Sequence, residues 1–340
     1  MAKVRMADIA AQVGVSTVTV HNALAGQKGV SEEMRARILK VADELGYRQM
    51  SAVVKRGGRG LRNIGVIISE RYLADYTTFY WKMYQEMVLI ATDKGCMAAV
   101  EILKYDMEEN FVLPRIEEEH TVDALIILGE ISRKYIHFLK KHTDVPVICL
   151  DFYDKELADD AVITDNFYGM YHMTEYLFEK GFTKMAYVGS IHSTSSIMDR
   201  YCGFYKAQME HGQEVPSEWV LEDRNKKGEI HITLPEKMPE AFVCNCDMTA
   251  GLLIDELERQ GYRVPEDVSV VGYDNYLDAG FQDRRITTYE INTRIMSKEA
   301  LEKAIKKMKN SAFGKGMSIV SGRIVEKDSV LVRGKRDITV

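Results

Sequence analysis

Two acidic residues stand where buried strands are expected to end. Asp247 follows the apolar run 241–246, and Asp274 follows the run 268–273. Parallel strands of an open sheet present their carboxyl ends to one crevice, so both carboxylates should project into the same ligand site. Arg200 offers a planar set of donors that could face these acids, an arrangement that commonly holds sugar hydroxyls or a purine edge. The alternative is that the three residues form a salt-bridge network between two lobes.

Aromatic residues follow the first apolar run of the same region, at Tyr72, Tyr76, Phe79, Tyr80 and Trp81. Rings in such a cluster can stack on the face of a sugar or a base, and Tyr72 and Phe79 are our candidates for that role. The same spacing is typical of a helix face packed into the core, so both interpretations stay open.

The first 62 residues differ from the rest in charge. They contain 11 lysines and arginines against 5 acids, a net charge of +6, so the other 278 residues carry −12 within the total of −6. A small basic segment on an acidic body suggests that the segment alone meets a polyanion.

Four cations lie in a glycine-containing stretch just before the first buried run: Lys55, Arg56, Arg59 and Arg62. We expect them to contact phosphates or the minor groove of DNA, and their removal to lower the salt slope of binding by about three units. The alternative is a solvated basic linker without a role in binding.

Three short helices are predicted before residue 48. The first stops at Gly14, Ser16 is a good N-cap for a second helix through Leu24, and a third helix runs from Ser31 to Gly46. Two helices joined by a tight turn, with a third packed on them, form a helix-turn-helix whose second helix enters the major groove. The candidate DNA contacts are Ser16 and the residues of the second helix left facing outward, which are Thr17, Val18, His21 and Asn22.

From residue 63 onward, short continuous apolar runs alternate with amphipathic helical stretches. Runs buried on both faces and separated by helices indicate parallel sheets covered by helices. With about ten such runs, two α/β lobes fit the pattern better than one sheet.

Several other classes of protein are disfavoured. The glycines at 57–60 precede a strand instead of following one, and no G-x-S-x-G motif occurs, so we expect neither an enzyme nor a bound cofactor. The five cysteines are typical of reduced buried thiols, and Cys244 and Cys246 lack a partner pair at zinc-like spacing, so no metal is expected. No apolar stretch reaches the roughly 18 residues of a membrane span and no secretory signal opens the chain, which favours a cytoplasmic protein without membrane contact.

The amino-terminal motifs resemble those of the lactose and galactose repressor (LacI/GalR) family of transcription regulators. The matching residues, at consistent spacing, are Asp8 to Ala10, Gly14 to Val20, Ala23, Leu24, Val30, Ser31, Arg35, Arg37, Ile38 and Leu45 to Tyr47. The resemblance continues through Asp165, Asn166 and Gly169 to the stretch 264–274. The family's body is a two-lobed fold like that of periplasmic sugar-binding proteins, with a ligand in the cleft.

This resemblance implies a helix-turn-helix DNA-binding domain over residues 1–48, a hinge over 49–62 and an effector-binding and dimerisation domain over 63–340. Lobe 1 would comprise about 63–163 and 290–320, and lobe 2 about 164–289 and 321–340. The implied function is a repressor that binds a pseudopalindromic double-stranded operator as a homodimer. Its effector would be a sugar or sugar derivative, with a purine or nucleoside as the alternative. A small-molecule binding protein without a DNA role is the alternative class.

The chain also departs from the family. Where the family has Ser-Arg, it has His21 and Asn22, so we hypothesise that Asn22 reads an A·T pair, with a phosphate or water contact as the alternative. Val18 or Thr17 would touch a thymine methyl and His21 a phosphate. Arg56 takes the place of the family's intercalating leucine. Residues 219–240 carry two prolines where the family has a helix, and Trp219 is a further candidate because that segment often supplies an aromatic ring to the pocket.

Overall fold

The computed structural model describes residues 6–24, 29–45, 62–73, 79–119, 121–155, 160–225, 229–276, 285–310 and 316–333. The chain divides into two compact units, Met1–Leu61 and Arg62–Val340.

The first unit contains three helices, α1 (Met6–Val13), α2 (Thr17–Leu24) and α3 (Glu32–Glu44). Gly14 adopts a positive φ of 78°, which lets the chain turn sharply between α1 and α2. Ser16 caps α2, because its Oγ accepts a hydrogen bond from the amide of Thr19 at 3.1 Å. A small core holds the three helices together and consists of Ile9, Ala10, Val13, Val20, Ala23, Ile38 and Ala42. These helices match the helix-turn-helix pattern of the sequence.

The second unit contains two six-stranded sheets with the strand orders β11-β5-β4-β3-β1-β2 and β12-β10-β9-β8-β6-β7. The first sheet comprises β1 (Arg62–Ser69), β2 (Cys96–Leu103), β3 (Ala124–Leu128), β4 (Val147–Leu150), β5 (Ala161–Thr164) and β11 (Ser318–Val320). The second comprises β6 (Met185–Val188), β7 (Val220–Leu221), β8 (Ala241–Cys244), β9 (Ser269–Asp274), β10 (Thr287–Glu290) and β12 (Arg323–Val325). The strand pairs are parallel except for the edge pair β10 and β12, which the sequence did not predict as antiparallel.

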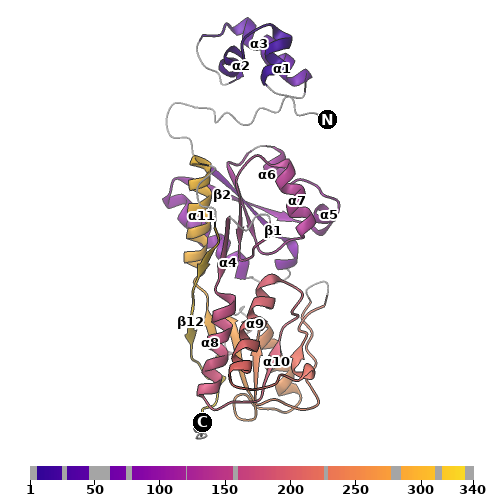
Figure 1. Ribbon diagram of the computed structural model, residues 1–340, viewed down its shortest axis with the longest axis vertical. Helices are drawn as coiled ribbons and strands as arrows, with labels where there is room; N and C mark the ends of the chain where they lie inside the picture. The colour runs from indigo at the N-terminus through magenta and orange to yellow at the C-terminus, as the bar shows by residue number, and fades with distance from the viewer. Residues whose placement is uncertain are drawn as a thin grey trace. The chain divides into compact units, whose positions relative to one another are not determined.

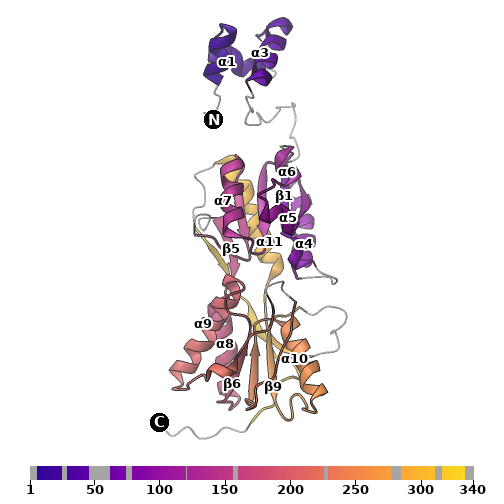
Figure 2. The ribbon, with the colours of Figure 1, turned by 90° about the vertical axis from the view of Figure 1, so that its right-hand side faces the viewer.

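Helices cover both faces of each sheet, which explains why the strands are continuously apolar. The helices of the first lobe are α4 (Phe79–Asp93), α5 (Tyr105–Glu109), α6 (Arg115–Glu118), α7 (Arg133–His142) and α11 (Thr293–Lys309). Those of the second lobe are α8 (Asn166–Glu179), α9 (Ser195–Glu210) and α10 (Asp247–Arg259). α4 and α11 lie on one face of the first sheet and α5 to α7 on the other, while α8 and α9 lie opposite α10 across the second sheet (Figure 1 and Figure 2).

Two segments differ from, or bear on, the sequence-based expectations. Arg62 belongs to β1, where its register partner is Cys96 of β2, and so it is part of the body and not of the hinge. Residues 55, 56 and 59 lie outside the described part of the chain. In 219–225 and 229–240 the structure has no α-helix, in agreement with the two prolines of this segment. None of the described helices is long and apolar enough to cross a bilayer.

The close packing of α8 on α9 requires a glycine at position 203. A Cβ built on Gly203 would lie 2.1 Å from the carbonyl oxygen of Phe167, far inside contact distance. We expect Gly203→Ala to lower the free energy of unfolding by about 3 kcal/mol, because the clash is with backbone and cannot be relieved by a side-chain rotation. Urea unfolding would measure this, with Met209→Ala, an exposed position of the same helix, as the nearly neutral control. Equal stabilities of the two variants would contradict the close approach.

Candidate functional site

Arg200 lies at the centre of a buried polar cluster in lobe 2. Its Nε donates to Asn166 Oδ1 at 2.8 Å and its Nη1 to the carbonyl oxygen of Asn245 at 2.6 Å. Its Nη2 lies 3.1 Å from Asp274 Oδ1, and the guanidinium sits 3.9 Å from the ring centroid of Tyr273. Burial disfavours the charge of Arg200, but the carboxylate of Asp274 outweighs this effect and keeps its pKa above the usual value. The predicted pairing of Arg200 with a strand-end aspartate is therefore present.

A second strand-end aspartate comes from lobe 1. Asp151 directly follows β4, has a positive φ of 68° and is 5% exposed. Its Oδ2 accepts a hydrogen bond from the hydroxyl of Tyr80 at 2.9 Å, while its Oδ1 has no hydrogen-bond partner. Burial raises the pKa of Asp151 to about 6, and the charge of Arg200 opposes that rise. The sequence-based search missed Asp151, although it follows a strand just as Asp274 does.

Asp274 is also incompletely satisfied. It ends β9 with a positive φ of 101°, and its Oδ1 lacks an aligned hydrogen bond although Arg200 Nη2 is close. Burial raises the pKa of Asp274 to about 7, Arg200 counteracts this, and the charge of Asp151 raises the pKa further. Carboxylates from the two lobes thus act on one another across the cleft.

Aromatic rings line the lobe 1 side of this cluster. The rings of Tyr72 and Tyr80 pack edge to face with centroids 4.6 Å apart, and Tyr72 donates to the carbonyl oxygen of Glu130 at 2.6 Å. A Cβ at Gly129 would lie 2.7 Å from the Tyr72 ring, so the glycine lets this ring approach the backbone. Phe79 meets Tyr276 of lobe 2 with ring centroids 6.1 Å apart. The predicted residues Tyr72 and Phe79 are therefore both at the junction of the lobes.

A carboxylate of lobe 1 also binds the start of a lobe 2 helix. Glu130 Oε2 accepts hydrogen bonds from the amide of Ser195 at 2.7 Å and from its hydroxyl at 2.8 Å. Ser195 is the first residue of α9, whose amino end favours a negative charge. These two bonds hold the lobes together beside the cluster.

Asp223 and Arg224 extend the cluster from the segment that departs from the family. Asp223 is fully buried and accepts hydrogen bonds from Arg224 Nε and Nη2, from the Asn245 amide, from the Thr249 hydroxyl and from the Ser190 amide. These bonds, led by those of Arg224, outweigh the burial that alone would raise the pKa of Asp223, and they hold it well below its usual value. The position of Asp223 after β7 is the signal that could have revealed this pair.

Two predicted effector contacts lie elsewhere. Asp247 begins α10 and is 1% exposed; its Oδ2 accepts from the amide of Tyr276 at 2.9 Å, and its Oδ1 occupies the space left by the missing Cβ of Gly272. It therefore braces the loop after β9 and does not face the cleft. Trp219 precedes β7, at the opposite end of the sheet, and its indole donates to the carbonyl oxygen of Lys237 at 2.8 Å.

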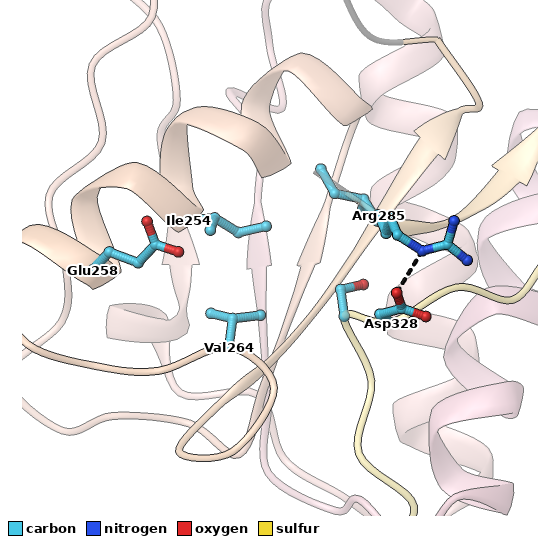
Figure 3. Close-up of a pocket in the computed structure, with 7 residues that line it drawn as sticks. Ile254, Glu258, Val264, Arg285 and Asp328 are labelled. Carbon is cyan, nitrogen blue, oxygen red and sulfur yellow. Dashed lines mark hydrogen bonds and ion pairs between the residues drawn. The ribbon is translucent and has the colours of Figure 1, made fainter. Parts of the chain in front are cut away.

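A separate pocket of about 210 Å³ lies at the amino ends of β9 and β10 (Figure 3). It is lined by Ile254, Glu258, Val264, Arg285, Ile286, Asp328 and Ser329. Arg285 and Asp328 form an ion pair at its edge, and both side chains are about two-thirds exposed. None of the predicted site residues belongs to this pocket. Among the residues with described side chains, no group of three or more histidines, cysteines or acids is placed to hold a metal ion.

The second helix of the first unit exposes most of its candidate DNA contacts. Ser16 and Thr17 are exposed, Val18 is 65% exposed and Asn22 is half-buried. Arg35 from α3 donates to the carbonyl oxygens of Ala23 and Asn22, at 2.6 and 3.3 Å, and so fixes the end of this helix. The side chain of His21 is not among those that the structure describes. An exposed valine on a well-packed helix is suited to an apolar contact with a thymine methyl.

Comparison with known proteins matches both units. Residues 5–49 match the family model "Bacterial regulatory proteins, lacI family", and residues 174–330 match "Periplasmic binding protein-like domain". The transcriptional repressor PurR of Vibrio campbellii is 25% identical over 336 residues, which cover 95% of this chain and 97% of that protein. PurR of Vibrio parahaemolyticus is likewise 25% identical over 336 residues.

Solved structures share the fold. The regulator CelR in complex with cellobiose has a TM-score of 0.65 at 18% identity, with 96% of this chain and 99% of that chain covered. The lac repressor dimer bound to operator and the anti-inducer ONPF has a TM-score of 0.64 at 20% identity, with 97% and 100% covered. A lacI-type head, a two-sheet binding-protein-like body and relatives matched along almost their whole length identify this chain as a DNA-binding transcriptional repressor of the LacI/GalR family.

Proposed function

We propose that the chain represses transcription by binding a pseudopalindromic operator as a homodimer, and that a small polar effector between the lobes sets its affinity for DNA. The observation that carries the proposal is the cluster of Arg200, Asp151 and Asp274, which draws on both lobes and leaves two carboxylate oxygens without hydrogen-bond partners. Buried polar atoms without partners are rare in native structures, and a ligand that supplies donors accounts for them. Two copies are needed because one helix-turn-helix offers few contacts, while paired heads read two half-sites.

A sugar or sugar derivative is the proposed effector, because aromatic rings beside carboxylates suit a ring that carries hydroxyls. A purine or nucleoside is the second candidate, since relatives named PurR are similar along almost the whole chain. Binding would change the angle between the lobes and with it the spacing of the two heads. A coupling free energy of about 1–3 kcal/mol would change operator affinity roughly 5- to 150-fold.

An electrophoretic shift assay with genomic fragments and the full-length protein tests the DNA part of this proposal. The retained fragment then serves in a screen of sugars, nucleosides and purine bases for compounds that change its affinity. Binding that shows no sequence preference at any salt concentration would refute the proposal.

Substitution of Asn22 with alanine is expected to relax operator selection at one base-pair position per half-site. An asparagine amide pairs bidentately with adenine N6 and N7, and the loss of such a pair costs about 1–3 kcal/mol of discrimination. Selection from a randomised operator library, followed by sequencing of the bound pool, would measure the change. An unchanged preference at every position would show instead that Asn22 contacts phosphate or water.

A further inference from the structure

We propose that the effector is recognised as a donor of hydrogen bonds, either through hydroxyls or through a protonated amine, and that phosphorylated and carboxylated metabolites are refused. This inference rests on the proposed function, since it concerns the ligand of the same cleft. It follows from which atoms of the described cleft residues are already engaged and which are not.

The two cleft arginines are engaged by the protein itself. Each of the three side-chain nitrogens of Arg200 has a partner, in Asn166, Asn245 and Asp274. Arg224 spends Nε and Nη2 on the carboxylate of Asp223, at 3.0 and 2.6 Å, and Nη2 also meets Asn245 Oδ1. A guanidinium that is already neutralised by a bidentate carboxylate has little attraction left for an anion. An acidic effector would therefore find no unpaired arginine among the described cleft residues.

The unused atoms are acceptors. Asp151 Oδ1 comes from lobe 1 and Asp274 Oδ1 from lobe 2, and neither has a hydrogen bond although each is buried. The two carboxylates are close enough for the charge of Asp151 to act on Asp274. A ligand between them must supply donors, since two carboxylates that face an acceptor group would leave all the partners unsatisfied.

The charge balance has the same sign. The cleft residues described above comprise two arginines, Arg200 and Arg224, and four carboxylates, Glu130, Asp151, Asp223 and Asp274. Glu130 is occupied by Ser195, and Asp223 is occupied by Arg224 and its other donors. The remaining surplus of negative charge, in a buried setting where water screens weakly, attracts an ammonium group and repels phosphate.

Thermal-shift assays with matched ligands test the selectivity on the full-length protein. D-glucose, D-glucosamine and D-glucose 6-phosphate form one set, and adenosine with adenosine 5′-monophosphate forms another. We expect any stabilisation to come from the neutral or aminated member, with the phosphorylated member at least roughly tenfold weaker, since each 1.4 kcal/mol changes affinity tenfold. A phosphorylated member that stabilises the protein more than its neutral parent would overturn the proposal.

A second measurement needs no ligand and decides the matter even if no compound of these sets binds. Asp151→Asn removes an unsatisfied buried charge, so the melting temperature of the free protein at pH 7.5 should rise by a few degrees. The matched control is Asp223→Asn, because the Asp223 carboxylate is fully buried but satisfied by several donors, and its melting temperature should fall. If Asp151→Asn lowers the melting temperature as Asp223→Asn does, Asp151 is a structural residue and the proposal fails.

The pH dependence of the same variants gives an independent readout. The folded pKa of Asp151 is raised to about 6 by burial, so its contribution to stability is fully present below pH 4 and is lost as the pH rises through 6. The groups that face it are Tyr80 from α4, Glu130 after β3, Arg200 from α9 and Asp274 at the end of β9. Asp151→Asn should reduce the fall in melting temperature between pH 4 and 7.5, and an unchanged fall would count against the proposal. Failure of the proposed function would be distinct, since it would appear as a loss of sequence-selective DNA binding in the wild-type protein.

Discussion

Replacement of Arg200 with methionine is expected to lower the free energy of unfolding of the body by about 3–5 kcal/mol and to abolish the response to effector. The magnitude is that of removing one partner from a buried ion pair, which leaves the other charge uncompensated. Here two carboxylates would lose their compensating cation, since Arg200 pairs with Asp274 and its charge also acts on Asp151. Methionine has a similar length and keeps the apolar contact with the Tyr273 ring, so the loss reports the charge and its hydrogen bonds.

Urea unfolding of the full-length protein would measure the loss of stability. Arg259→Met is the control, because Arg259 forms an ion pair with Glu256 on the exposed side of α10 and its side chain is 70% exposed. Exposed pairs of this kind contribute at most about 1 kcal/mol. If Arg200→Met and Arg259→Met unfolded at the same urea concentration, the cluster would not be the buried, charge-balanced unit that the geometry indicates.

The strand-end rule found part of this cluster from the sequence. Asp274 ends β9 and meets Arg200 as predicted, and the same rule would have found Asp151 after β4 and Asp223 after β7. The rule failed for Asp247, although it also stands just after a strand. Periodicity locates a residue along the chain, but the direction of its side chain depends on local φ values and on neighbours.

Asp247 turns inward because Gly272 on the adjacent strand leaves room for its carboxylate, and no pattern in either segment shows that the two meet. The bonds between Glu130 and Ser195 raise the same difficulty, since they join positions 65 residues apart in different lobes. Topology followed from the alternation of apolar runs and helices because each run needed cover on both faces. Contacts between lobes depend on tertiary packing and could not be derived from periodicity.

The position of Arg62 turns one of the sequence-based expectations into a controlled experiment. Four cations were predicted to bind DNA between the head and the body, but Arg62 lies in β1 with Cys96 of β2 as its register partner. Substitution of Lys55, Arg56 and Arg59 with glutamine should therefore lower the slope of log affinity against log salt by between two and three units, at about 0.9 for each phosphate that is no longer neutralised. Arg62→Gln alone should leave the slope unchanged.

The size of the effect follows from counterion release. Each cation that neutralises a phosphate frees part of a condensed counterion, so a fourfold rise in salt weakens the wild type more than the triple variant by about 30-fold. Fluorescence anisotropy with one labelled operator at several salt concentrations would give both slopes. Parallel lines for the wild type and the triple variant would show that the basic stretch is only a solvated linker. A slope change caused by Arg62→Gln would show that the amino end of β1 contacts DNA.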